Sequence, residues 1–190
     1  FVKSLKKNTL DKITKIDQSV ILFKKKETKI GQYYLKKIGT SEYNFICFHA
    51  RDSAYLKQYD NTRNWNYHDY RDSEINTYLP SMQEMAKKNF FCFRMGSVVS
   101  GKLRLISSKI IDYANSNDQS DLLDIYLSSK CRFFLCSQTG ISIFPETFNR
   151  PIAYVNCYHF PVSWFHTNQV FNNNSLIITK KYYSIKEKRF

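Results

Sequence analysis

Short runs of apolar residues alternate along the chain with stretches in which apolar residues recur at helical spacing. Unbroken apolar runs are typical of parallel strands that are buried on both faces. They predict strands within residues 45–48, 90–95, 105–113, 131–136 and 151–156. The helical spacing predicts helices over residues 29–38, 73–88, 118–128 and 141–148. Residues 52–71, which are polar and aromatic, show neither pattern, and we expect a long loop there.

Strands that alternate with helices of this length form β-α-β units, in which the sheet is parallel and helices cover both faces. The pattern therefore predicts the α/β class, with a mainly parallel, Rossmann-like sheet. We expect residues 1–26 to be a lead-in or an interdomain linker and residues 27–160 to form the domain. Residues 161–190, which include one more apolar run at 176–178, are expected to be a C-terminal extension.

The composition fits one globular domain of a cytoplasmic protein. With 190 residues, 43% of them hydrophobic, and only five glycines and four prolines, the chain can bury a sizeable core. The five cysteines include no CxxC pair, so no zinc site or redox motif is indicated, and their odd number suits a reducing cytosol. No apolar run approaches the roughly 20 residues that span a bilayer. Because residue 1 is Phe, we expect the chain to be a segment of a longer protein.

The net positive charge of the chain favours anionic partners but does not show which kind. The 29 Lys and Arg against 16 Asp and Glu give a formal charge of +13, which suits nucleic acid, anionic lipid or phosphorylated small molecules. Many lysines crowd the two ends of the chain, where they could hold a protein against an anionic membrane surface. Solvated surface lysines explain the same excess, so the charge alone names no function.

Polar residues follow the predicted strands, at the edge of a parallel sheet where ligands of α/β proteins bind. Arginine follows two of the strands, and its planar fork of donors matches the paired oxygens of a phosphate. The turn formed by residues 137–140 leads into a predicted helix, where free N–H groups favour an anion. Together these residues predict a pyrophosphate site, although neither a GxGxxG nor a GxxxxGKS/T motif is present. The strand-end residues are His49, Arg51, Asp52, Arg94, Gly96, Asp112, Asn115, Ser137, Gln138, Thr139 and Gly140.

The first strand end carries the motif H-x-R-D-x-x-Y, formed by His49, Arg51, Asp52 and Tyr55. It is followed by the segments HDYRDSEINTYLPSMQEMAKKNFFCFRMG and IIDYANSNDQSDLLDIYLSSKCRFFLCSQTGISIFPETFNRPIAYVN. In this order the motifs resemble those of a family of bacterial glycosyltransferases of the GT-B type, over residues 27–160. More loosely, they are similar to protein O-fucosyltransferases and ADP-heptose heptosyltransferases, whose C-terminal Rossmann-like domains bind the nucleotide sugar.

The resemblance implies roles for the strand-end residues. Arg51 would contact the diphosphate of the donor and His49 would orient the site or touch the sugar, so these two residues are the catalytic candidates. Arg94 and Gly96 would border the nucleotide, and the turn at residues 137–140 would donate to the phosphates. Enzymes of this kind generally need no divalent metal, and no other cofactor is implied. The residues implied near the base and the ribose are Asp112, Asn115 and Asp118.

Several of these residues also have a structural interpretation. His49 could fix the loop through backbone hydrogen bonds. Asp52 could pair with Arg51 or cap the loop, because an aspartate beside an arginine is a poor base near neutral pH. The tyrosines of the following segment could stack on a base or a sugar, but in a chain with 14 tyrosines and 15 phenylalanines we expect them to pack in the core. We expect two aspartates of the third helix to lie on a solvated face. These residues are Tyr55, Tyr67 and Tyr70, and Asp121 and Asp124.

The resemblance implies the donor-binding half of a glycosyltransferase, without its acceptor domain. Such an enzyme would transfer a sugar from a nucleoside-diphosphate sugar to a polysaccharide, lipid-linked or protein acceptor. It would work in the bacterial cytoplasm or at the inner face of the membrane, in the synthesis of cell-surface polysaccharide. Two alternatives stay open: a basic nucleic-acid-binding module, and a nucleotide-binding domain without activity.

Overall fold

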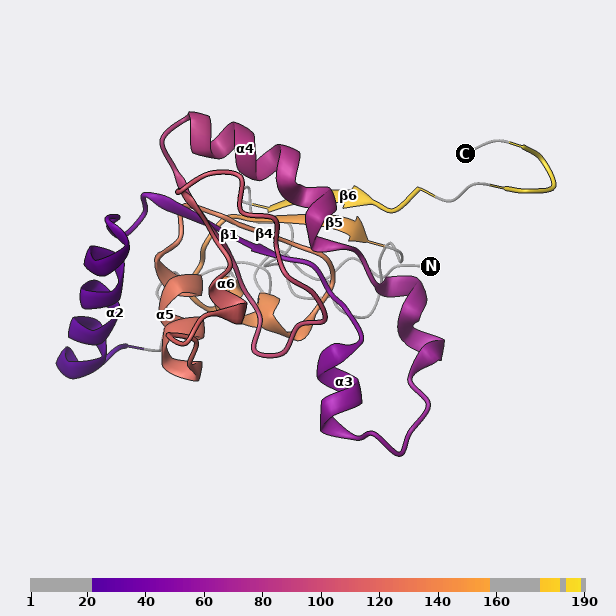
Figure 1. Ribbon diagram of the computed structural model, residues 1–190, viewed down its shortest axis with the longest axis horizontal. Helices are drawn as coiled ribbons and strands as arrows, with labels where there is room; N and C mark the ends of the chain where they lie inside the picture. Colours follow the sequence, from indigo (N-terminus) through magenta and orange to yellow (C-terminus); the bar gives the residue numbers. More distant parts are fainter. Residues whose placement is uncertain (1–21, 158–174, 182–183, 189–190) are drawn as a thin grey trace, which may run out of the picture.

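The computed structural model describes residues 22–157, 175–181 and 184–188. Within these residues, six strands form one all-parallel sheet in the order β3-β2-β1-β4-β5-β6 (Figure 1). This is the strand order of a doubly wound Rossmann sheet, so the predicted α/β class and parallel sheet are confirmed. The strands are β1 (Phe45–His49), β2 (Phe91–Arg94), β3 (Ile110–Ile111), β4 (Phe134–Cys136), β5 (Ile152–Cys157) and β6 (Ser175–Thr179).

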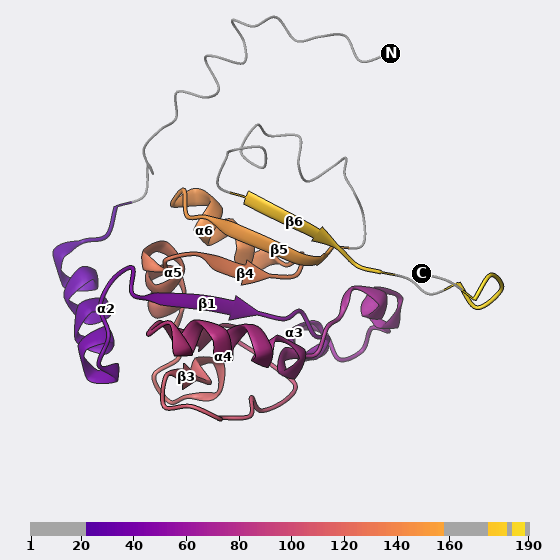
Figure 2. The ribbon, with the colours of Figure 1, turned by 90° about the horizontal axis from the view of Figure 1, so that it is seen from above.

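Helices cover both faces of the sheet. Figure 1 shows α4 above the strands and α5 and α6 below them, and the view from above in Figure 2 places α2 beside the start of β1. The α-helices are α2 (Lys25–Ile38), α3 (Ala54–Tyr59), α4 (Leu79–Lys87), α5 (Asp121–Lys130) and α6 (Ile143–Thr147). Four short 3-10 helices lie between them: η1 (Asn66–Arg71), η2 (Ile75–Tyr78), η3 (Tyr113–Asn115) and η4 (Gly140–Ser142). None of the helices in the described ranges is both long enough and apolar enough to cross a membrane.

Strand β1 is the centre of the core, and every one of its residues is buried. Phe45 and Cys47 point into the cluster that α2 and α5 cover, while Ile46 and Phe48 point into the cluster under α4. Because side chains alternate along a strand, a strand between two helical layers must be apolar on both faces. Burial of each large apolar side chain contributes about 1.5–3 kcal/mol, so β1 holds the two layers together.

Helix α2 begins four residues before its predicted start. The Lys24 N–H donates to the Glu27 carboxylate at 2.7 Å, which gives the helix a cap that apolar periodicity does not reveal. The predicted C-terminal end is correct, because Gly39 takes the left-handed conformation there with a φ of 88°. The apolar run at 176–178 belongs to β6, so the sheet continues beyond residue 160.

The predicted third strand is mostly wrong, since only Ile110 and Ile111 pair with β2. Leu105 and Ile106, from the first half of the predicted run, are exposed instead. An apolar run of this length therefore does not define a strand unless a neighbouring strand reaches it. The helix expected from residue 73 begins as η2 at Ile75, and its α-helical part begins only at Leu79.

The long loop expected over residues 52–71 is also wrong, because α3 and η1 lie within it. Neither helix buries a residue, so neither has the apolar periodicity from which a helix is predicted. The core packing expected for its tyrosines is wrong as well. Their exposed fractions are 54% for Tyr55, 56% for Tyr67 and 43% for Tyr70.

Gly31 is where α2 and α5 come closest. A Cβ atom at this position would lie 2.2 Å from the Tyr126 ring, which is held in place by Phe23 and by a hydrogen bond from its hydroxyl to Glu42. We expect Gly31→Ala to lower the free energy of unfolding by roughly 1–2 kcal/mol, because the steric cost of about 1–3 kcal/mol exceeds the helix propensity gained. Urea denaturation measures the change. Gly101→Ala is the matched control, since no atom lies within 4 Å of its Cβ position; equal or higher stability of Gly31→Ala would contradict this close approach.

Candidate functional site

A pocket of about 510 Å³ lies beside the residues that follow β1, β2 and β4. In the strand order, the chain winds from β1 outward to β2 and β3 and then crosses to β4 on the other side of β1. Ligands of doubly wound sheets bind at this reversal, outside the carboxyl ends of the strands. The pocket is therefore in the place where a Rossmann-like sheet binds its ligand.

Arg51 lies in the pocket wall and also joins its elements. Its backbone N–H donates to the Ser137 hydroxyl at 2.9 Å, which links the end of β1 to the end of β4. Its guanidinium Nη1 donates to the carboxylate of Asp72 and, at 3.2 Å, to the carbonyl of His68. Burial lowers the pKa of Arg51 from its ordinary value, and the neighbouring charge of Arg71 acts in the same direction. Both side-chain bonds use Nη1, so Nη2 and Nε make no hydrogen bond to a described residue.

Arg71, at the end of η1, is a second arginine in the pocket wall and was missed from the sequence. Its Nη2 donates to the Gln138 carbonyl at 3.4 Å, and its Nε is buried without a hydrogen-bond partner among the described residues. No strand precedes it, so the rule that points to strand ends does not find it. Its place in the segment HDYRDS, within the resemblance, was the available signal.

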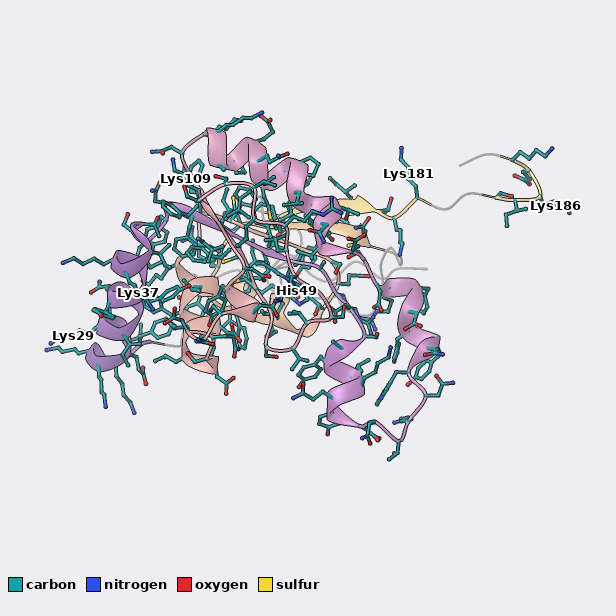
Figure 3. The ribbon with its side chains drawn as sticks, in the orientation of Figure 1. Lys29, Lys37, His49, Lys109, Lys181 and Lys186 are labelled. Atoms are coloured by element: carbon teal, nitrogen blue, oxygen red, sulfur yellow. The ribbon has the colours of Figure 1, made fainter. Side chains whose placement is uncertain are left out.

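His49, the last residue of β1, is a neutral imidazole at neutral pH. Burial lowers its pKa to about 4, against the opposing effect of the Asp52 carboxylate. Its Nδ1 is buried without a hydrogen-bond partner, so the backbone hydrogen bonds considered as its structural role are not formed to any described residue. Figure 3 labels it near the centre of the molecule. Gly96 lies against the ring, with a φ of 139°, and a Cβ there would be 3.6 Å from the imidazole.

Asp52 caps the loop after β1, one of the two structural roles considered for it. Its Oδ1 accepts from the Ala54 N–H at 2.9 Å, and its Oδ2 accepts from the N–H and the hydroxyl of Ser100 at 2.9 and 3.1 Å. Among the described residues, the ion-pair partner of Arg51 is Asp72 rather than Asp52. Asp52 therefore joins the start of α3 to the loop that follows β2.

Arg94 and Asp112 form a separate buried network that does not line the pocket. The guanidinium donates to the Asp112 carboxylate at 3.4 Å and to the Gly101 carbonyl. The other carboxylate oxygen accepts from the Leu103 N–H at 2.9 Å and from the Asn115 amide at 2.8 Å. A buried arginine needs such a partner, and here it fixes the loop between β2 and β3.

Asp118, expected near the base and the ribose, also lies elsewhere. Its carboxylate pairs with Lys37 of α2 at 2.7 Å on the surface. The turn after β4 is divided: Ser137 is buried and accepts from Arg51, and the Gln138 carbonyl accepts from Arg71. The last two residues of this turn, Thr139 and Gly140, line the pocket. Of the predicted site residues, the structure brings together at the pocket His49, Arg51, Gly96, Thr139 and Gly140.

Asp124 of α5 also lines the pocket, and its expected place on a solvated face is wrong. The residue is 6% exposed, its Oδ2 accepts from the Gln119 amide at 2.9 Å, and its Oδ1 has no partner among the described residues. Burial raises its pKa to about 6. The missed signal is helical spacing, because Leu127 and Ser128 lie three and four positions further on and are both buried.

Comparisons of the chain with family models, with curated proteins and with solved structures found no match. In the part of the chain that the structure describes, no three His, Cys, Asp or Glu side chains are grouped so that they could hold a metal ion. The ionisable groups that line the pocket are thus the guanidinium groups of Arg51 and Arg71, the imidazoles of His49 and His68, and the carboxyl groups of Asp52, Asp121 and Asp124.

The raised pKa of Asp124 predicts a pH-dependent effect of Asp124→Asn. Between about pH 4 and pH 6 the folded protein holds this proton more tightly than the unfolded chain, so the wild type loses stability as the pH rises through that range. The variant has no such loss. We therefore expect its stability relative to the wild type to increase from pH 4 to pH 7, by on the order of 2 kcal/mol.

Urea denaturation at several pH values measures this difference. The titration of His49 raises the stability of the folded protein as the pH rises over a similar range. This contribution is the same in the wild type and the variant, so it cancels in the difference. Asp121→Asn, which removes an exposed carboxylate from the same helix turn, controls for the loss of negative charge near the start of α5. A difference that does not change with pH would show that Asp124 is solvated.

Proposed function

We propose that this chain is the donor-binding half of a glycosyltransferase of the GT-B type, which uses a nucleoside-diphosphate sugar. The observation that carries the proposal is the convergence of Arg51 and Arg71 on a pocket at the strand-order reversal of a Rossmann-like sheet. Paired arginines suit a diphosphate because each offers a planar fork of donors. A pocket of about 510 Å³ is also in the range that holds ligands of this size.

The two walls of the pocket suit the two ends of such a donor. The arginine wall would take the diphosphate, with the guanidinium groups of Arg51 and Arg71 as hydrogen-bond donors to its oxygens. Asp124 of α5 also lines the pocket, and its carboxyl group would accept from hydroxyl or amino groups of the ribose and base. This assigns to Asp124 the role that the sequence placed on Asp112, Asn115 and Asp118.

During transfer, an acceptor oxygen would form a bond to the anomeric carbon of the donor sugar, while the bond from that carbon to the diphosphate oxygen breaks. The electron pair leaves with the nucleoside diphosphate, and the two arginines would stabilise the charge that develops on it. The acceptor hydroxyl must lose its proton to a base. His49 is a weak base, because burial lowers its pKa to about 4, so its role would be a hydrogen bond to the donor sugar.

The nucleic-acid alternative has less support. It requires a continuous basic face with aromatic residues in it. In Figure 3, Lys29 and Lys37 lie on α2 at one end of the molecule, while Lys181 and Lys186 lie at the other. Contact of the basic ends with an anionic membrane surface stays a prediction, since most of the N-terminal lysines lie outside the described residues.

Nucleotide binding tests the proposal through thermal stability. With UDP, GDP, ADP and CDP offered in turn, we expect one of them to raise the melting temperature, since a ligand at about 100 times its Kd adds roughly 2.7 kcal/mol. Arg71→Ala should weaken this binding by about tenfold or more. Arg150→Ala is the matched control, because that half-buried arginine stacks on Tyr43 and does not line the pocket.

Arg71 is a cleaner target than Arg51, whose removal would leave the carboxylate of Asp72 without its partner and destabilise the fold. If single-stranded RNA raises the melting temperature and no nucleoside diphosphate does, the glycosyltransferase proposal is wrong. An unchanged nucleotide affinity in Arg71→Ala would remove that residue from the site.

A further inference from the structure

An aromatic arm, residues 53–72, leaves the sheet at the end of β1 and returns to it. Figures 1 and 2 show its helix α3 beyond the carboxyl end of β1, away from the helical layers. The exposed fractions of its tyrosines reach 77% at Tyr59, and neither α3 nor η1 buries a residue. Large aromatic rings gathered on an exposed projection mark an interaction site rather than a part of the core.

The rings of the arm stack on one another instead of on the core. Tyr55 and Tyr59 are stacked with centroids 6.5 Å apart and an interplanar angle of 12°. Trp65 and Tyr67 are stacked at 6.2 Å and 27°, and the guanidinium of Arg63 lies 4.9 Å from the centre of the indole ring. These contacts favour particular orientations of the rings before any ligand binds, which lowers the entropy cost of binding.

The base of the arm is fixed to the rest of the fold. Asp72 pairs with Arg51, and the Lys180 ammonium donates to the carbonyls of Tyr70 and Asp72 at 2.8 and 3.1 Å. Within the arm, the Trp65 indole N–H donates to the Asp60 carbonyl at 2.8 Å. The arm is therefore attached to the domain at its base, and its aromatic residues have defined positions relative to the sheet.

The arm is also continuous with the pocket. Tyr55 and Leu56 from α3, and His68 and Arg71 from η1, all line it. The inner end of the arm is thus one wall of the proposed donor site, and its outer end presents Tyr59 to solvent. A ligand that lies along the arm would end at the pocket.

The charge of the arm indicates which class of ligand suits it. Three basic residues (Lys57, Arg63, Arg71) are balanced by three acidic ones (Asp60, Asp69, Asp72). A nucleic-acid surface needs an excess of positive charge to meet the phosphates, and this arm has none. Its other polar residues are mainly neutral hydrogen-bonding side chains, namely Gln58, Asn61, Thr62, Asn64 and Asn66.

We propose that the aromatic arm binds the saccharide chain of the acceptor, a proposal that rests on the glycosyltransferase function. One face of a sugar ring presents C–H groups, which pack on the electron-rich face of an aromatic ring. The hydroxyls at the rim of the sugar would bond to the phenol and amide groups beside it. A saccharide on the arm would direct its terminal hydroxyl into the pocket, toward the anomeric carbon of the bound donor.

The test measures binding of the complete 190-residue chain to an array of defined oligosaccharides, with titration calorimetry on the oligosaccharide bound best. We expect the double variant Tyr59→Ala, Tyr67→Ala to bind it about tenfold more weakly or worse, as the loss of exposed aromatic anchors does. Tyr33→Ala is the matched control, since Tyr33 of α2 is 72% exposed, lies outside the arm and should bind like the wild type. Tyr59→Phe, which keeps the ring, should retain most of the affinity.

Each alternative gives a different result. Saccharide binding that is equal in the double variant, or absent from the wild type while a nucleoside diphosphate still binds, overturns the arm proposal and leaves the proposed function standing. Binding of single-stranded RNA through the arm, or a dimer of the chain that the double variant dissociates, also overturns it. Saccharide binding that depends on the arm, in a chain that binds no nucleoside diphosphate, would support the arm and contradict the proposed donor site.

Discussion

A guanidinium that is taken out of water needs an anionic partner, and the way Arg51 meets this requirement organises the whole binding edge of the sheet. Asp72, its partner, is the last residue of the aromatic arm, so one ion pair fixes the arm to the end of β1. The backbone N–H of Arg51 donates to the Ser137 hydroxyl and so fixes β1 to the turn after β4. The pocket, its arginine wall and the position of the arm all depend on these two attachments.

Strand register explains why some strand-end residues reach the pocket and others do not. His49 pairs in register with Cys136, which lies in the core cluster covered by α5, so the imidazole is on the same side of the sheet as Asp124. Arg94 pairs with Phe48, whose side chain lies under α4 on the opposite side. Paired residues of parallel strands point to the same face. The two basic residues therefore end in different surroundings, although both follow apolar runs in the sequence.

Much of the fold could be predicted because β1 is buried on both faces, and because β2, β4 and β5 also leave short apolar runs in the sequence. The five predicted residues that line the pocket, His49, Arg51, Gly96, Thr139 and Gly140, all follow from the rule that ligands bind where parallel strands end. Arg71 and Asp124 could not be found by that rule, because one lies on a helix that buries nothing and the other on a helix that is buried almost all round. The third strand failed because pairing with β2, rather than local composition, decides where it begins.

The strand order also sets the sequence of events in folding. Cys47, in the central strand, must pair with Phe134 on one side and with Phe93 on the other, and the chain between these partners has to be ordered before the pairs can form. Contacts between residues so distant along the chain slow folding, because the entropy of closing the loop is lost before the contact stabilises the chain. During synthesis β1 leaves the ribosome before β4, so its edge toward β4 is unpaired until β4 follows. The central strand, which is fully buried in the finished sheet, therefore has an edge that can pair with other chains until β4 is made.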